Sequence, residues 1–180
     1  MKKLLVVLIV LVVVLGAIGY MTPKDYHIAK SITIDAPPSA VHAYVGDLRR
    51  WPEWAPWNEQ DPTIRTTYGE QTAGIGAHQS WTSEEGDGEL TLTMSDPAKG
   101  IAYDMAFIKE DSRVPATSAM TYEPSADGGT VVTWSMEGTW DGVVAPVVDG
   151  WMKILSPMMI GGMFDDGLAN LKSKVEASST

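Results

Sequence analysis

The chain contains no cysteine and few basic residues. Without cysteine it has no disulfide, no thiolate metal ligand and no cysteine nucleophile. Its 13 Lys and Arg residues are outnumbered by 23 Asp and Glu residues, so the formal net charge is −10. That charge repels a phosphate backbone, and no His-Glu-x-x-His or similar metal spacing occurs. We therefore expect no nucleic-acid partner, no metal ion and no cofactor.

The chain has a single long apolar run, from Leu4 to Met21, which follows Lys2 and Lys3. About 18 apolar residues, at about 1.5 Å each, can cross a hydrocarbon core about 30 Å thick. The run predicts a membrane anchor with a short hinge in residues 1–24 and a water-soluble domain in residues 25–180. Basic residues before the run favour a cytoplasmic amino terminus. We therefore expect a single-pass protein with its domain on the extracytoplasmic side, periplasmic or outer.

A cleaved signal peptide is the alternative interpretation of the same run. Ala17-Ile18-Gly19 has the small-x-small pattern of a cleavage site and would leave Tyr20 as the mature terminus. The apolar core is longer than that of most signal peptides, which favours the anchor. Gly16 and Gly19 are three residues apart, whereas dimerising membrane helices space small residues by four. We therefore expect a monomer.

Strand patterns dominate the first two thirds of the predicted domain. Residues 26–35 alternate as a strand does, and Pro37 and Pro38 then introduce a short helix. Glycine-, aspartate- and proline-rich turns separate five further strand patterns, at residues 74–83, 89–95, 101–109, 116–122 and 130–139. Short turns between consecutive strands predict an antiparallel meander.

The carboxyl-terminal segment has helical periodicity. Its apolar stripe consists of Phe164, Leu168, Leu171 and Val175. We expect Pro157 and the glycines at 161 and 162 to separate this helix from an earlier apolar piece at residues 147–155. The predicted fold is α+β, with a curved antiparallel sheet packed on the last helix. Because a long twisted sheet curls, we expect an apolar cavity between sheet and helix.

Alternation along the strands and the helix indicates which side chains would line that cavity. The predicted ligand-binding residues are Trp81, Leu92, Met94, Tyr103, Met105, Phe107, Met120, Trp134, Met136, Met163 and Phe164. Methionine adapts to irregular apolar shapes, which suits a pocket for a hydrophobic molecule. Ordinary core packing accounts for the same methionines equally well.

Three tryptophans, Trp51, Trp54 and Trp57, recur at intervals of three residues in a proline-rich segment. They fit a rim over the cavity or a contact with the membrane interface. They also fit a plug at one end of the core, which we favour because indole area serves mostly in packing. An exposed tryptophan patch would instead favour a scaffold that holds a partner protein.

No catalytic group stands out. The histidines His27, His42 and His78 fall beside the hinge, on the first helix and on an outward strand position. Asp104 and Glu137 also fall on outward positions, although a register shift of one residue would turn them inward. Acid–base catalysis needs a titratable group that reaches the bound substrate. We therefore name no catalytic residue.

Several motifs resemble one family. They are Ile32-Thr33-Ile34-Asp35-Ala36-Pro37-Pro38, Val41, Asp47-Leu48, Trp51-Pro52-Glu53-Trp54-Ala55-Pro56-Trp57, Asp61-Pro62, Tyr68-Gly69, Gly74-x-Gly76-Ala77, Trp81 and Gly167-Leu168-Ala169-Asn170-Leu171-Lys172. Together they resemble the SRPBCC superfamily, which includes START domains, polyketide cyclases and Bet v 1-like proteins. The resemblance is to bacterial, membrane-anchored members of the polyketide cyclase/dehydrase and lipid transport type, and it covers residues 26–176.

The resemblance implies a helix-grip fold, in which a curved antiparallel sheet wraps around a long carboxyl-terminal helix. It also implies a hydrophobic molecule held between sheet and helix. We expect membrane-tethered binding or transport of a lipid or another hydrophobic small molecule. The alternative is a polyketide cyclase/dehydratase-like enzyme, which requires an acid or base that points inward.

Overall fold

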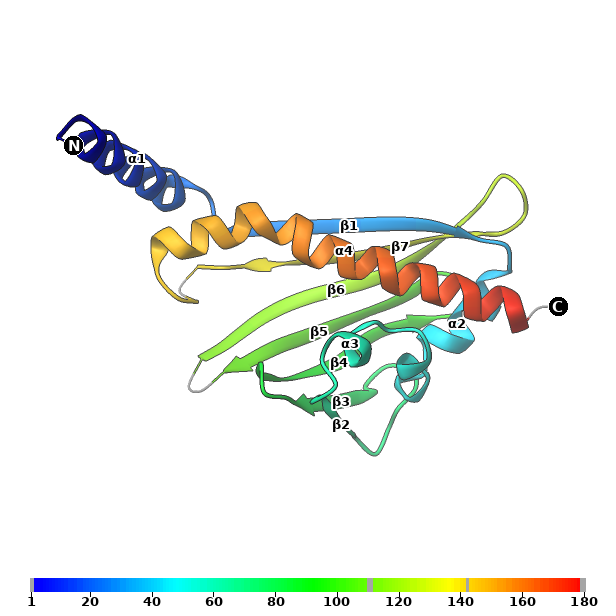
Figure 1. Cartoon of the computed structure of the whole chain (residues 1–180). Coiled ribbons are helices and arrows are strands. Elements are labelled where there is room, and N and C mark those ends of the chain that lie inside the picture. The colour runs from blue at the N-terminus through cyan, green and yellow to red at the C-terminus, as the bar shows by residue number, and fades with distance from the viewer. Residues whose placement is uncertain (1, 110–111, 142, 179–180) are drawn as a thin grey trace.

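The computed structural model describes residues 2–109, 112–141 and 143–178. Its elements follow the order α1 (Lys2–Met21), β1 (Asp25–Ile34), α2 (Pro38–Val45), the 3₁₀ helix η1 (Leu48–Glu53), α3 (Trp57–Gln60), β2 (Arg65–Tyr68), β3 (His78–Thr82), β4 (Asp87–Asp96), β5 (Gly100–Lys109), β6 (Ser112–Pro124), β7 (Thr130–Thr139) and α4 (Pro146–Ser178). The seven strands form one sheet in the order β1-β7-β6-β5-β4-β3-β2 (Figure 1). Each neighbouring pair of these strands is antiparallel. The predicted α+β helix-grip fold is confirmed.

The two faces of the sheet differ in burial. Along β7 the side chains alternate between one face that α4 covers and another that lies open to solvent. We call the covered side the inner face and the opposite side the outer face. Trp134 and Met136 are buried on the inner face, whereas Glu137 is exposed on the outer face. The predicted helical stripe of α4 is also buried in this core: Phe164, Leu168, Leu171 and Val175.

The segment of η1 and α3 places tryptophans in the core. Trp51 and Trp54 are each 1% exposed. Their indole N–H groups donate to the carbonyl oxygens of Val45 (2.8 Å) and Tyr44 (3.3 Å), respectively. The interpretation as a core plug is therefore confirmed, and these two side chains form no exposed patch for a partner.

Helix α4 differs from the prediction because it runs without interruption through Pro157. A proline lacks the N–H that would donate to the carbonyl four residues earlier, here that of Lys153. The hydroxyl of Ser156 donates to this carbonyl instead, at 3.0 Å. The predicted break at Pro157 and the following glycines was therefore wrong, because a neighbouring side chain satisfies the orphaned acceptor.

Helix α1 is, within the described part of the chain, the one helix long and apolar enough to cross a membrane. It projects from the domain, while its last turns contact the first turns of α4 (Figure 1). Two segments far apart in sequence thus meet at one end of the molecule.

Candidate functional site

The predicted ligand-binding residues separate into two groups by burial. Those that pack inside the core are at most 4% exposed: Leu92, Tyr103, Met120, Trp134, Met136 and Phe164. The helix, the η1 segment and the sheet enclose them, so they stabilise the fold. Met163 is partly buried against this core from α4.

A second group, Trp81, Met105 and Phe107, lies at the end of the inner face nearest the start of α4. The left-hand ends of β5 and β6 in Figure 1 have no helix over them. Accordingly, Phe107 is 41% exposed, and Trp81 and Met105 are half-buried. We call these three side chains the open apolar end.

A glycine creates the space for this group. The Trp81 ring lies over Gly88, where an added Cβ would come within 2.1 Å of the indole. The ring then meets Phe107 edge-on, with centroids 6.1 Å apart. Gly88 directly opposes Trp81 on β3 and Phe107 on β5. Sequence reasoning treated Gly88 only as part of a turn and missed this role.

Two buried polar atoms have no hydrogen-bond partner in the described structure: Oε1 of Gln79, on β3 beside the open apolar end, and Nε1 of Trp140, which lies across the sheet next to β1. The residue opposite Gln79 is Leu90, which in turn opposes Met105. Trp140 stacks on Tyr26 with ring centroids 5.2 Å apart. A buried polar atom without a partner costs about 1–3 kcal/mol, so a ligand's polar group at the open apolar end would be stabilised by Gln79 Oε1.

Met94 does not join the predicted set on the inner face. The register of β4 shifts between Leu92, which pairs with Tyr103, and Met94, which pairs with Ala102. A bulge of this kind changes the phase of the alternation by one residue. The prediction that Met94 shares a face with Leu92 is therefore wrong.

Tyr103 belongs to a buried hydrogen-bond network. The Trp134 indole N–H donates to the Tyr103 hydroxyl (3.1 Å) and to Ser118 Oγ (3.2 Å), and Ser118 donates to the Ser135 carbonyl (2.6 Å). Burial raises the pKa of Tyr103 to about 12. The phenol stays neutral at physiological pH, and the network serves to hold the strands and the aromatic core together.

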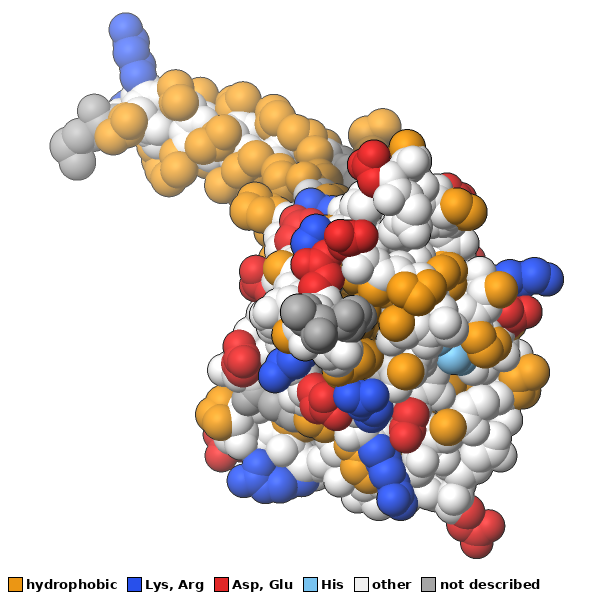
Figure 2. Space-filling view, turned by 90° about the vertical axis from the view of Figure 1, so that its right-hand side faces the viewer, with side chains coloured by type: hydrophobic (Ala, Val, Ile, Leu, Met, Phe, Trp, Pro, Cys, Tyr) orange, Lys and Arg blue, Asp and Glu red, His pale blue; other side chains and the backbone are white. Residues whose placement is uncertain are grey.

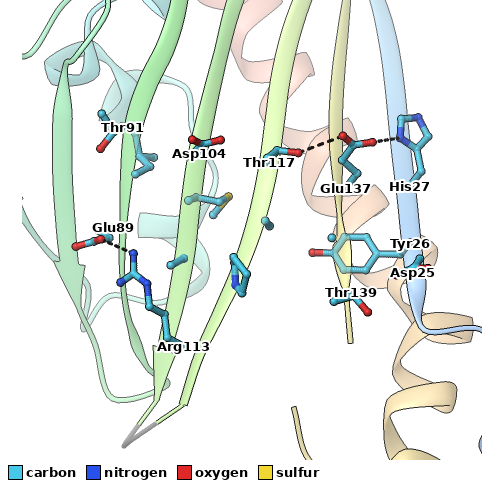
Figure 3. Close-up of a pocket in the computed structure, with 16 residues that line it drawn as sticks. Asp25, Tyr26, His27, Glu89, Thr91, Asp104, Arg113, Thr117, Glu137 and Thr139 are labelled. Atoms are coloured by element: carbon cyan, nitrogen blue, oxygen red, sulfur yellow. Dashed lines mark hydrogen bonds and ion pairs between the residues drawn. The ribbon is translucent and has the colours of Figure 1, made fainter. Parts of the chain in front are cut away.

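The outer face carries a polar row across five strands. Paired positions place His27, Glu137, Thr117, Asp104 and Thr91 side by side (Figure 3). This row borders a hollow of about 870 Å³ that is open to solvent. The prediction that the carboxylates point outward is confirmed. His78 also points outward, with Nδ1 3.0 Å from the hydroxyl of Thr91.

An ion pair crosses one side of the hollow. Arg113 on β6 donates to Glu89 on β4 at 2.7 Å. The pair spans the intervening strand β5 at Ala106, which is 2% exposed. The hydrogen bond from Arg113 lowers the pKa of Glu89. Within the described residues, no three His, Asp or Glu side chains are grouped to hold a metal ion. The lining of the hollow mixes these charged groups with apolar residues such as Ala106, Pro115 and Ala116, and it is open to solvent, unlike the predicted apolar cavity between sheet and helix.

His42 lies at the other end of the inner face, on α2. Its Nε2 is 3.1 Å from Ser95 Oγ, and its Nδ1 is 3.5 Å from the Tyr122 hydroxyl. Burial lowers the pKa of His42, and Asp96 partly opposes that shift. These contacts fasten α2 to β4 and β6.

The open apolar end has no acid–base pair in its nearest strand row. That inner-face row comprises Tyr26, Gly138, Ala116, Met105, Leu90 and Gln79. It holds neither a carboxylate nor a histidine. The arrangement suits non-covalent binding of an apolar molecule with one or two polar groups.

This fold, with a sheet packed on one long carboxyl-terminal helix, defines a helix-grip α+β protein. The family model described as "Polyketide cyclase / dehydrase and lipid transport" matches residues 26–176, so the chain belongs to that family. The family implies binding of hydrophobic ligands. No curated protein matches the chain.

Solved structures share the fold at low identity. A protein of Chromobacterium violaceum is 16% identical over 83% of this chain and 96% of its own, with a TM-score of 0.59. A protein of Rhizobium leguminosarum is 13% identical, covers 87% and 97% of the two chains and has a TM-score of 0.62. DynU16, from the dynemicin biosynthetic locus, is 14% identical, covers 84% and 48%, and has a TM-score of 0.56.

Proposed function

We propose that this protein binds a lipid or another hydrophobic small molecule at the open apolar end, while α1 holds it at a membrane. The exposed and half-buried apolar side chains beside the unpartnered, buried Oε1 of Gln79 support the proposal most directly. An apolar ligand would cover Trp81, Met105 and Phe107. Its polar group would satisfy Gln79 Oε1.

The short connection between α1 and the sheet supports a role at a membrane. Four Cα–Cα steps separate Met21 from Asp25, where β1 begins. An extended chain of that length reaches about 13–14 Å. The domain would therefore stay next to the bilayer into which hydrophobic molecules partition. Lys2 and Lys3 favour its placement on the extracytoplasmic side.

Lipid extraction and native mass spectrometry of the purified full chain test whether a ligand co-purifies. A titration with dansyl-labelled undecanoic acid tests the location of the site. Phe107→Ala removes an apolar contact of about 1 kcal/mol, so we expect affinity to fall about fivefold. Thr117→Ala, on the outer face, is the matched control and should leave affinity unchanged.

Two results would contradict the proposal. One is a protein that carries no extractable ligand and fails to bind the dansyl probe. The other is probe binding that Thr117→Ala weakens and Phe107→Ala does not, which would place binding in the outer hollow.

A further inference from the structure

Helices α1 and α4 meet through two glycines. Gly19 and Gly150 are both buried at the contact. A Cβ added to Gly150 would fall on the carbonyl oxygen of Gly19, and one added to Gly19 would lie 2.4 Å from the carbonyl oxygen of Val147. Small residues permit this close approach of two backbones, as they do between helices in membranes.

A hydrogen bond fixes how far along α1 the contact reaches. The Trp151 indole N–H donates to the Leu15 carbonyl oxygen at 3.2 Å. Leu15 lies six residues before Met21, where α1 ends. At about 1.5 Å per residue, Trp151 reaches about 9 Å back along α1 from its carboxyl-terminal end. If α1 spans a hydrocarbon core, the first turns of α4 must then enter the edge of the same bilayer.

The surface of α4 near this contact is unusually apolar. Met158 and Met159 are 75% and 72% exposed. Other apolar side chains in and just before the first turns are more than one third exposed: Val144, Val147, Val148, Ile154 and Leu155. We call these seven residues the α4 apolar surface. Figure 2 shows that α1 is likewise covered with hydrophobic side chains, whereas acidic and basic side chains are spread over the visible face of the domain.

Few charges interrupt the α4 apolar surface. Residues 143–159 contain only Asp149 and Lys153 as charged side chains. Asp149 is fully buried and accepts a hydrogen bond from the Val144 N–H at 2.9 Å, so its charge does not face solvent. Lys153 can extend its ammonium to the headgroups while its methylene stem stays in the apolar layer.

We propose that residues 146–159 of α4 lie in the interfacial layer of the bilayer beside α1, as a second, partly inserted membrane contact. Lipid is the occupant because the surface adjoins α1 and its first turns lie at the depth that the Trp151 contact sets. The proposal rests on the anchoring role of α1 proposed above, and it does not depend on the identity of the ligand. In this placement the open apolar end faces the membrane, because it lies at the same end of the molecule as the start of α4 (Figure 1).

The absence of cysteine allows a direct test with single reporter cysteines. Leu155→Cys, Met158→Cys and Met159→Cys are each labelled with nitrobenzoxadiazole in the full chain, reconstituted into phosphatidylcholine vesicles. We expect blue-shifted emission at all three sites and strong quenching by doxyl-labelled lipids. Ala126→Cys and Ala177→Cys, exposed in the β6–β7 turn and the last turn of α4, are the controls and should show neither effect.

Two outcomes would overturn the proposal. Emission at residues 155, 158 and 159 that matches the two controls would show that the surface is in water. A blue shift without doxyl quenching, together with disulfide-linked dimers of unlabelled Met158→Cys, would show that a second copy covers it. A dansyl-undecanoic acid titration of the same vesicles reports ligand binding separately, so either result is distinguishable from a failure of the proposed carrier function.

Discussion

The indole ring of Trp134 stacks flat on the phenyl ring of Phe164, with centroids 4.2 Å apart and 7° between the planes. This contact joins β7 to α4 at the centre of the molecule, and both side chains are 1% exposed. Trp54 and Trp57 meet the same indole edge-on, with centroids 5.6 and 5.8 Å away. The aromatic cluster therefore fills the space where the family pattern predicts a ligand, and leaves the open apolar end as the candidate site.

The two phenylalanines of the chain should lose different amounts of stability on truncation to alanine. Phe164→Ala leaves a cavity in the core, and we expect a loss of about 3–5 kcal/mol in the free energy of unfolding. Phe107→Ala removes a side chain that is 41% exposed, so its loss should stay below about 1.5 kcal/mol. Urea unfolding in detergent, followed by circular dichroism, measures both. Equal losses would contradict this division between core and site.

Gly19 and Gly16 provide a matched pair on α1. A side chain at Gly19 would collide with Val147 and Trp151, whereas an added Cβ at Gly16 meets no atom within 4 Å. We expect Gly19→Leu to weaken the α1–α4 contact by about 1–3 kcal/mol and to speed amide exchange in residues 146–155. Gly16→Leu should leave that exchange unchanged. Hydrogen-exchange mass spectrometry measures both variants. Equal exchange rates in residues 146–155 would contradict the role of Gly19 in the α1–α4 contact.

His42 should make stability depend on pH. Burial lowers its pKa below the usual 6.5, although Asp96 partly opposes the shift. The unfolded chain then binds the proton more tightly than the folded chain. The stabilising contribution of neutral His42 is therefore complete above about pH 6.5 and is lost as the pH falls toward the folded pKa. We expect a smaller drop in Tm between about pH 7.5 and pH 5.5 for His42→Gln than for the wild type. An identical drop in Tm for the two proteins would show that His42 does not cause the pH dependence of stability.

Ser156 and Pro157 should be energetically coupled. Ser156→Ala leaves the Lys153 carbonyl without its donor, which we expect to cost about 0.5–1.5 kcal/mol. In a Pro157→Ala background the same change should cost almost nothing, because the alanine N–H reaches that carbonyl. A double-mutant cycle by urea unfolding measures the coupling. Additive effects would show that the hydroxyl does not replace the missing donor.

The periodicity of apolar and polar residues predicted most of the fold. Periodicity reflects which positions are buried, and the preference for burial is a property of each residue type. The stripe of Phe164, Leu168, Leu171 and Val175 is buried as its spacing predicted. Asp104 and Glu137 point outward as strand alternation predicted. The strand patterns missed the short edge strand β2. The other errors lie at Met94 and Pro157, where a bulge and a side-chain donor change a local rule.

The candidate site was only partly predictable. Trp81, Met105 and Phe107 were predicted from alternation, but the same pattern also selected core residues such as Met120. Gly88, Gln79 Oε1 and Trp140 Nε1 became informative only through distances and burial across several strands. Alternation tells which face a side chain occupies, and it does not tell whether another element covers that face.

The amino-acid sequence by itself determined the apolar helix, the strand and helix periods, the acidic surface and the family pattern, because these follow from side-chain chemistry and short spacing. Only the tertiary structure decided that the tryptophans pack in the core beside α4, that Gly19 meets Gly150, and that one end of the sheet stays uncovered. Those features depend on contacts between segments far apart in sequence, as between Leu15 and Trp151, which are 136 residues apart. Such contacts are set by the packing of the whole chain.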